Sequence, residues 1–398
     1  MSNLSKWNIF FPNCNPFSLN LRMAFPLLLI SCSHSIQLNW KSCPPIPPRS
    51  GMVRQFGLAG PVSGASGNFI MVGGGANFEN GMPWRGGTKL YHDRIFLLRK
   101  NADASLSWKE SESKLPGPLA YPACITMKDG FISLGGENES GPVRSVFHYS
   151  FANGEVKIES LPDLPDDLSS PGATAIEDQL FVAGGLNKKG ATNGFYTLSL
   201  SHLSQGWKKL PDLPVSLSHA VVVAQNDGHE TAVYVIGGRN KKGELSTFLS
   251  TVYKFSPSKQ KWFHAGEITS DGKPVPISAG TGAAIGNNRI VLFGGDRGFF
   301  FNQTERMNLA IAAEQDASRK DSLLRRKDHF LTNHPGFSNQ ILTFNTLSGK
   351  WSESGEIPGK SPATTSAFSW KGKIVIPSGE IRPGVRTDKV LMVEIKEN

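Results

Sequence analysis

The sequence predicts an all-β fold built from six similar four-stranded units. Short apolar runs that end in a glycine pair recur along the chain, and most are followed by a tryptophan and a proline-rich link. The composition agrees, with 42 Gly and 26 Pro among 398 residues. Both residue types favour tight turns between short strands and interrupt helices.

Six apolar runs define the repeat, and only the last departs from the glycine pair, with Ser378-Gly379. The runs are IMVGGG (70–75), ISLGG (132–136), LFVAGG (180–185), VYVIGG (233–238), IVLFGG (290–295) and IVIPSG (374–379). The fourth unit shows the whole plan. Its four expected strands, a to d, are HAVVVAQ (219–225), VYVIGG (233–238), TVYKFS (251–256) and KWFHAG (261–266).

A tryptophan marks the fourth strand of most units. These residues are Trp108, Trp207, Trp262 and Trp351, whereas the second unit has Val156-Lys157-Ile158 at this place. A unit of about 50 residues and four strands with this pattern resembles the kelch repeat. We therefore expect a six-bladed kelch β-propeller.

The two ends of the chain are expected to complete one blade together. The sixth unit ends after its third strand, 389–395, and the missing fourth strand is found near the N-terminus in IQLNWKSCPPIPP (36–48). Pairing these segments would close the ring and remove an open sheet edge.

Residues 1–32 are interpreted as a signal peptide, and residues 33–398 as the propeller. Lys6 and Arg22 precede the short apolar run 23–31, and Leu29-Ile30-Ser31-Cys32 follows the pattern of a bacterial lipobox. Cys32 would then carry the lipid, which predicts a periplasmic protein anchored to a membrane. A cleaved signal without a lipid and a wrongly assigned start remain open.

One face of the propeller is expected to carry the chemistry, because the loops after the glycine pairs emerge there close to the axis. Asn77, Glu137, Arg297 and Glu380 follow glycine pairs, or Ser378-Gly379, within two residues. The asparagines in this series could simply stabilise their own turns.

The fifth unit inserts about 40 residues (298–337) on the same face of the propeller. We expect this insertion to form one or two helices, with Thr304 as an N-cap, and to act as a lid.

Several function classes lack a signal in the sequence. The net charge of +9 comes without a Lys/Arg block, so no nucleic-acid partner is expected. Nucleophile elbows, phosphate-binding loops and His/Cys metal motifs are absent, so we expect neither a metal nor a cofactor.

The remaining candidate for a functional site is the pair formed by Glu380 and Arg386, six residues later. An arginine stabilises a neighbouring carboxylate and can bind a ligand carboxylate through two hydrogen bonds; the alternative is an ion pair that only braces a loop.

The segment around this pair carries a family resemblance. IPSGEIRPGVRTDKV (376–390) resembles the N-G-E-x-x-P-G-x-R-T-D segment of the bacterial sialic-acid mutarotases, or N-acetylneuraminate epimerases. The resemblance implies that Glu380 is the proton acceptor and Arg386 its functional partner. Segments 73–98 and 120–137 are also similar to the family, which adds Tyr121 to Glu137, Asn77 and Arg297 as candidate substrate-binding residues. Here the Glu-bearing unit comes last, as in a cyclically permuted branch of the family.

The resemblance implies an isomerase that interconverts the α and β anomers of N-acetylneuraminate, a small acidic sugar, by acid–base ring opening and closure. Tyr121, Glu137, Arg297 and water are the candidates for the acid. The alternative is a non-catalytic kelch module that binds a glycan or a protein. A glycosidase would need a nucleophile and a second acid that the sequence does not clearly supply. The sequence predicts no particular oligomeric state.

Overall fold

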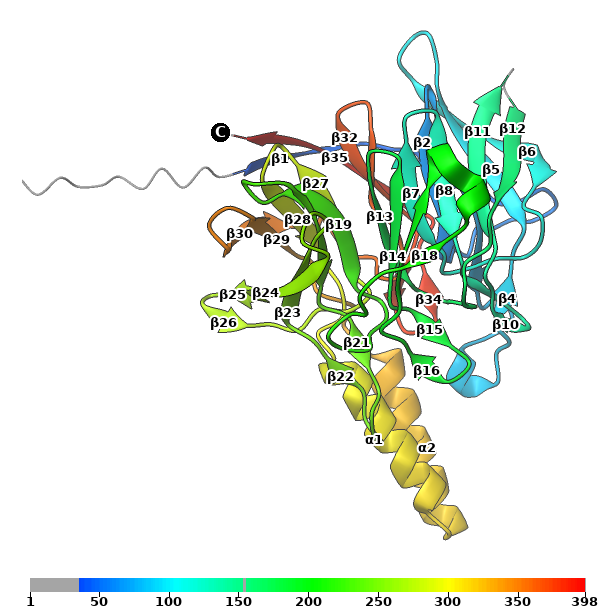
Figure 1. Ribbon diagram of the computed structural model, residues 1–398. Helices are drawn as coiled ribbons and strands as arrows, with labels where there is room; N and C mark the ends of the chain where they lie inside the picture. Colours follow the sequence, from blue (N-terminus) through cyan, green and yellow to red (C-terminus); the bar gives the residue numbers. More distant parts are fainter. Residues whose placement is uncertain (1–35, 153–154, 398) are drawn as a thin grey trace, which may run out of the picture. The chain divides into compact units, whose positions relative to one another are not determined.

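The computed structural model describes residues 36–152 and 155–397, which form six antiparallel sheets, each with four main strands, arranged as the blades of a propeller (Figure 1). The predicted signal peptide and Cys32 lie outside the described residues. In chain order the blades contain β2 (Ala59–Ser66), β3 (Phe69–Asn77), β5 (Arg94–Lys100) and β6 (Leu106–Lys114); β7 (Ala123–Met127), β8 (Gly130–Leu134), β11 (Val146–Ala152) and β12 (Glu155–Leu161); β13 (Gly172–Ile176), β14 (Gln179–Ala183), β17 (Phe195–Ser199) and β18 (Lys208–Lys209); β19 (Val221–Asn226), β20 (Thr231–Ile236), β23 (Thr251–Ser256) and β24 (Lys261–Glu267); β27 (Thr281–Ile285), β28 (Arg289–Phe293), β29 (Gln340–Asn345) and β30 (Lys350–Glu356); and β31 (Phe368–Trp370), β32 (Lys373–Pro377), β35 (Val390–Glu397) and β1 (Ile36–Lys41).

The smaller elements lie in the connections between these strands. They are the two-stranded ribbons β9 (Glu137–Asn138) with β10 (Gly141–Pro142), β15 (Leu186–Asn187) with β16 (Gly190–Ala191), β21 (Arg239–Asn240) with β22 (Thr247–Phe248), β25 (Thr269–Ser270) with β26 (Lys273–Pro274) and β33 (Glu380–Arg382) with β34 (Val385–Arg386); β4 (Leu90–Tyr91), which pairs with β3; and the short helices η1 (Pro83–Arg85) and η2 (Leu200–Gln205). The helical insertion consists of α1 (Phe299–Ala313) and α2 (Ala317–Thr332).

The predicted closure is confirmed. Strand β1 pairs antiparallel with β35 along its whole length, with Leu38 opposite Ile395 and Trp40 opposite Val393. The first and the last described strands thus share one sheet, and β35 has a partner on both sides. The apolar side chains of each sheet pack against those of the neighbouring blade, so the core is divided into clusters between blades. At the seam, Ile70 and Val72 of the first blade pack with Val375 and Met392 of the last.

The recurrent tryptophan and proline belong to one contact. The indole N–H of Trp108, Trp207 and Trp262 donates to the carbonyl of Pro44, Pro162 and Pro211, respectively, at 2.8–2.9 Å. In each case the proline lies in the link that enters the blade carrying the tryptophan. The contact satisfies the indole N–H while the partly buried ring packs at the edge of its blade, which explains why the two residue types recur together.

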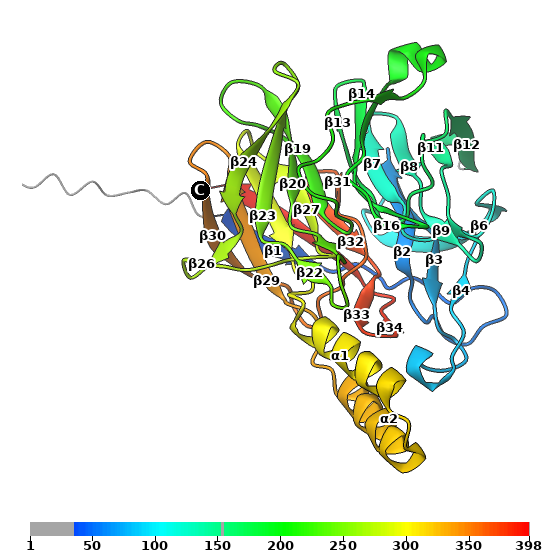
Figure 2. The same cartoon turned by 60° about the horizontal axis from the view of Figure 1, so that its bottom comes forward.

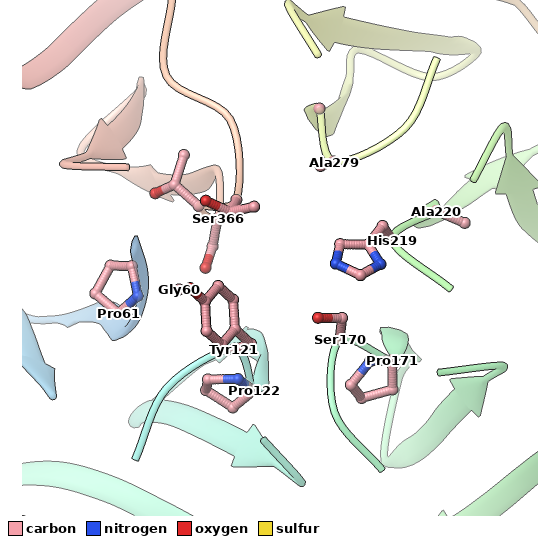
Figure 3. A pocket seen from close by; sticks show the side chains of 13 residues that line it. Gly60, Pro61, Tyr121, Pro122, Ser170, Pro171, His219, Ala220, Ala279 and Ser366 are labelled. Carbon is pink, nitrogen blue, oxygen red and sulfur yellow. The ribbon is translucent and has the colours of Figure 1, made fainter. Parts of the chain in front are cut away.

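A closed ring of backbone hydrogen bonds surrounds the central axis. Figure 3 shows residues around this axis, among them Gly60, Tyr121, Ser170, His219 and Ala279. One residue at the entrance to each blade takes part, and all six have φ between 49° and 57°: Gly60, Tyr121, Ser170, His219, Ala279 and Thr364. The N–H of each donates to the carbonyl of the preceding member, at 2.6–3.2 Å, and Gly60 closes the circle by donating to Thr364. Since five of these residues are not glycine, the left-handed backbone costs about 1–2 kcal/mol at each. The ring offsets this cost by satisfying the polar backbone groups at the crowded axis.

The predicted insertion is confirmed between β28 and β29, but its first helix begins earlier than expected. Gly298, with a left-handed φ of 86°, is the N-cap of α1. Thr304 lies inside the helix, where its hydroxyl donates to the carbonyl of Phe300 at 3.0 Å. The prediction of Thr304 as N-cap was therefore wrong, because the glycine that leaves the propeller also starts the helix. Both helices project from the face that carries the small ribbons (Figure 2).

Candidate active site

A cavity of about 530 Å³ opens on the face from which the helices project. Its inner end is formed by members of the backbone ring, Tyr121, Ala279 and Thr364, and one wall comes from the helical insertion. This volume lies within the range of about 300–1,000 Å³ that is usual for small-molecule sites. The cavity therefore has room for a sugar of moderate size.

Glu380 and Arg386 face each other across the ribbon β33–β34 and both line the cavity. The sequence PGV turns the chain back between them, and Arg386 Nη1 lies 3.3 Å from Glu380 Oε1. The N–H of Gly384 in the turn also donates to Oε1, at 2.9 Å. Among the described residues nothing donates to the second carboxylate oxygen, Oε2. That oxygen is free to accept a proton from a ligand.

The Arg386 side chain is only 4% exposed. Its guanidinium group lies over the ring of Phe78, 4.7 Å from the ring centre, in a cation–π contact. Within the described part of the chain, Arg386 Nε and Nη1 make no hydrogen bond. A buried guanidinium with unused N–H groups is a strong binding site for a ligand oxygen, because leaving such donors unpaired is costly.

Ser378, the residue that replaces a glycine, sits at the start of this segment. Its φ of 55° matches the 60–64° of the first glycine in the other five pairs. At Gly74, Gly135, Gly184 and Gly237 a Cβ would come within 2.2–2.5 Å of a backbone oxygen of the adjoining link. Ser378 instead uses its hydroxyl, which donates to the Thr387 carbonyl at 2.6 Å and accepts from the Leu58 N–H at 2.8 Å. The serine therefore fixes the Glu380 segment to the first link of the chain.

Glu137 holds the equivalent position in the second blade but is surrounded by donors. Lys89, Tyr91 and Ser169 all reach its carboxylate at 2.7 Å. Burial alone would raise the pKa of Glu137, but the charge of Lys89 and these hydrogen bonds lower it below its usual value. Burial and the bond to Glu137 raise the pKa of Tyr91 to about 12. Lys89, which lines the cavity and lies 4.6 Å from the centre of the Tyr121 ring, links this cluster to the site.

The same position carries Arg239 in the fourth blade and Asp296 in the fifth, and both line the cavity. Burial raises the pKa of the Asp296 carboxyl, against the opposing effects of the Gly298 N–H and Arg239, and Glu380 raises it further. Burial lowers the pKa of Arg239, although nearby carboxylates oppose this. His219, 3.3 Å from Arg239, is held neutral because burial and Arg239 keep its pKa well below the usual value.

The helical insertion supplies an apolar wall. Phe300 and Phe301 of α1, with His334 and Phe337 after α2, line the cavity together with the ribbon of Glu380. His334 packs on Phe300, with ring centres 4.6 Å apart. Burial, assisted by Arg382 and Lys360, lowers the pKa of His334 to about 4, so this imidazole is neutral at pH 7.

The insertion is tied to the propeller near its base. Trp84 and Arg85 of η1 donate to Asp328 of α2, with the indole bond at 3.0 Å. Arg382 of β33 donates to the Thr332 carbonyl at the end of α2, at 2.7 Å. These contacts make the hairpin a wall of the cavity in this structure, and its motion as a lid stays a prediction.

The structure brings together only part of the residue set proposed from the sequence. Glu380, Arg386 and Tyr121 line the cavity, and Glu137 contacts it through Lys89. Asn77 does not line the cavity, because its amide is used by the Gly57 carbonyl and by His92. Arg297 is exposed and donates to Gln340 away from the cavity. Asn138 and Asn187 accept backbone N–H groups two residues on, which agrees with the alternative that these asparagines stabilise turns.

Sequence reasoning missed Lys89, Arg239 and Asp296 as site residues. A signal was present for two of them, since Arg239 and Asp296 directly follow a glycine pair, as Glu380 follows Ser378-Gly379. For Lys89 the chain gives no such signal, because it comes from a loop of the first blade and reaches Glu137 across a blade boundary.

Comparison with known proteins decides the family. The family model described as N-acetylneuraminate epimerase matches residues 161–398, more than half of the chain, including Glu380 and Arg386. The chain belongs to the N-acetylneuraminate epimerase family. Proteins named N-acetylneuraminate epimerase are similar to it at 29% identity over 166 residues in Salmonella typhimurium (strain LT2) and at 30% over 175 residues in Haemophilus influenzae (strain 86-028NP).

These matches cover part of each protein. The Salmonella match spans 40% of this chain and 40% of the relative, and the Haemophilus match spans 42% of each.

Among the described residues, no group of three or more His, Cys, Asp and Glu is arranged to hold a metal ion. No described helix combines the length and the apolar character needed to cross a membrane.

Proposed function

We propose that the protein is a sialic-acid mutarotase that interconverts the α and β anomers of N-acetylneuraminate. The observation that carries the proposal is the Glu380–Arg386 pair on the wall of a sugar-sized cavity, in a chain of the N-acetylneuraminate epimerase family. Names of relatives support the substrate class, and the geometry of the pair supports acid–base chemistry.

Ring opening requires two proton movements. Glu380 accepts the proton of the anomeric hydroxyl through its free oxygen Oε2 while the bond between C2 and the ring oxygen breaks. The ring oxygen receives a proton from an acid of the site, and C2 becomes a ketone. Rotation about C2–C3 then offers the other face of the ketone. Closure reverses both proton transfers, so the protein ends in its starting protonation state and no electrons move.

Arg386 would bind the carboxylate of the sugar. Its buried Nε and Nη1 make no hydrogen bond within the described residues, although Nη1 lies 3.3 Å from Glu380 Oε1, and one edge of a guanidinium group matches a carboxylate through two parallel hydrogen bonds. This contact would place C2, which bears the carboxylate, next to the base. Lys89 and Arg239 add positive charge to the same cavity. The aromatic wall from the insertion would pack against the apolar parts of the sugar.

Time-resolved proton NMR tests this function. A sialidase releases N-acetylneuraminate as the α anomer, and the approach to the β-rich equilibrium is followed with and without the protein. We expect acceleration by the wild type and loss of about 10²- to 10⁴-fold in kcat for Glu380→Gln, the usual contribution of a general base. Arg386→Ala should also abolish the acceleration. An unchanged rate with folded wild-type protein would overturn the proposal and favour a non-catalytic glycan- or protein-binding module.

We also propose a periplasmic location with a lipid on Cys32, on the basis of the lipobox pattern alone. Labelled palmitate should be incorporated into the full chain and not into Cys32→Ser, which should leave the membrane fraction. Equal labelling of both chains, or of neither, would overturn this proposal.

A further inference from the structure

Anomer exchange needs a second proton-transfer group besides Glu380, and this inference rests on the proposed function. The group must line the same cavity, hold a proton near neutral pH and not be consumed by structural hydrogen bonds. Of the candidates suggested by sequence, Tyr121 lines the cavity, but burial raises the pKa of its hydroxyl above the usual value, which makes it a weaker proton donor. Glu137 accepts three hydrogen bonds and Arg297 points away from the cavity. The two histidines beside the cavity, His219 and His334, are neutral.

Asp296 occupies the same position in the repeat as Glu380, one blade away. Each residue directly follows the left-handed pair at the end of its second strand, and each is bridged to the link that enters its own blade. Asp296 is bridged to Ser278, and Glu380 to Ala363. These two links are joined in the backbone ring by the Thr364 N–H, which donates to the Ala279 carbonyl at 2.9 Å. The two carboxyl groups therefore enter the cavity from neighbouring blades at the same level.

The surroundings of Asp296 leave it open to a ligand. Its Oδ1 accepts the N–H of Gly298 at 2.8 Å, at the start of α1. Among the described residues no side chain donates to it and no cation lies within 4.0 Å. Burial raises the pKa of Asp296 and Glu380 raises it further, so the carboxyl keeps its proton to a higher pH than an exposed aspartate would. Two carboxyl groups that line one cavity in different surroundings suit the acid and base of one reaction.

We propose that Asp296 is the general acid that works opposite Glu380. On opening, Asp296 gives its proton to the ring oxygen while Glu380 takes the proton of the anomeric hydroxyl. On closure, Glu380 returns a proton to the oxygen on C2 and Asp296 recovers the proton from the hydroxyl that becomes the ring oxygen. The number of protons is conserved over the cycle. Neither step requires another reactant.

Asp296→Asn tests this role, because the amide oxygen can still accept from Gly298 while the side chain can no longer exchange a proton. Initial rates are measured by the same NMR assay over a range of pH, with Asp212→Asn as the control. Asp212 is an exposed carboxylate paired with Lys209, so the control makes the same chemical change outside the site. We expect kcat to fall about 10²- to 10⁴-fold with KM changed much less.

The pH profile separates catalysis from structure. A general acid acts in its protonated form, so the wild-type kcat should decline as pH rises through the pKa of Asp296, and this decline should vanish in Asp296→Asn. Asp296→Glu, which restores a titratable carboxyl, should recover part of the rate. The assignment would be overturned if Asp296→Asn kept the wild-type kcat and pH profile. It would also be overturned if Asp296→Asn and Asp296→Glu lost the same amount of activity and both lost thermal stability to match. An inactive wild type would instead overturn the proposed function itself.

Discussion

Glu137 and Glu380 occupy the same position in two blades of one repeat, yet their surroundings differ completely. Glu137 accepts hydrogen bonds from three side chains, all supplied from outside its own ribbon. Among the described residues, the Glu380 carboxylate has partners only within its own ribbon, Arg386 and the Gly384 N–H, and both reach the same oxygen. The backbone repeat places a carboxylate at the cavity edge, but the saturation of its oxygens decides whether it braces the fold or can take a proton.

Among the substitutions that test this comparison, replacement of Arg386, the partner of Glu380, is expected to have the largest effect. Arg386→Lys keeps the charge but loses the planar fork and the contact with Phe78. Losing hydrogen bonds to a charged ligand costs about 1.5–3 kcal/mol, so we expect kcat/KM to fall about ten- to a hundredfold. Steady-state rates from the NMR assay give this value. A lysine variant with wild-type kcat/KM would show that only charge matters at this position.

Glu137→Gln should instead act on stability. The change leaves Lys89 without its anionic partner in a partly buried cluster, which we expect to cost about 1–3 kcal/mol of unfolding free energy. Turnover should change by less than about tenfold, well below the effect of a lost general base. Urea unfolding measures the free energy of unfolding, and the NMR assay measures turnover.

The pH dependence of that stability difference has a definite sign. The pKa of Glu137 is lower in the folded protein than in the unfolded chain. Its contribution is therefore fully present above the unfolded value of about 4.3 and is lost as pH falls through the folded value. The difference between wild type and Glu137→Gln should shrink in acid. A difference that grows in acid would contradict the hydrogen-bonded cluster.

Substitutions of Ser378 are expected to have the smallest effect on stability. They distinguish the contribution of backbone strain from that of the hydroxyl hydrogen bonds. Ser378→Gly loses both bonds of the hydroxyl but relieves the left-handed φ, so we expect a net loss of about 1 kcal/mol. Ser378→Ala loses the same bonds and keeps the strain, so it should be less stable than the glycine variant. Thermal unfolding of both proteins provides the comparison. The reverse order would mean that the hydroxyl contributes little.

The fold could be predicted from the sequence because its signals are local and repeated. Apolar runs and glycine pairs recur in nearly every blade, the Trp–Pro hydrogen bond occurs in three of them, and Trp40 identified the strand that closes the ring. Glu380 and Arg386 were also found locally, since a Pro-Gly turn brings two residues six apart into register. Asn77 shows the limit of this reasoning. Its place in the repeat resembles a site position, but His92 and the Gly57 carbonyl occupy its amide.

By itself the sequence determined the six-bladed repeat, the closure by residues 36–41 and the pairing of Glu380 with Arg386, because short-range periodicity and turn chemistry encode all three. Only the tertiary structure decided at which of the six equivalent positions the side chain keeps hydrogen-bonding capacity for a ligand. It brought Lys89 to Glu137, left Asp296 without a side-chain donor among the residues that the structure describes, and joined the entrances of six blades into one hydrogen-bonded ring. The physical reason is that hydrogen-bond saturation and burial depend on neighbouring blades, whose residues lie far apart along the chain.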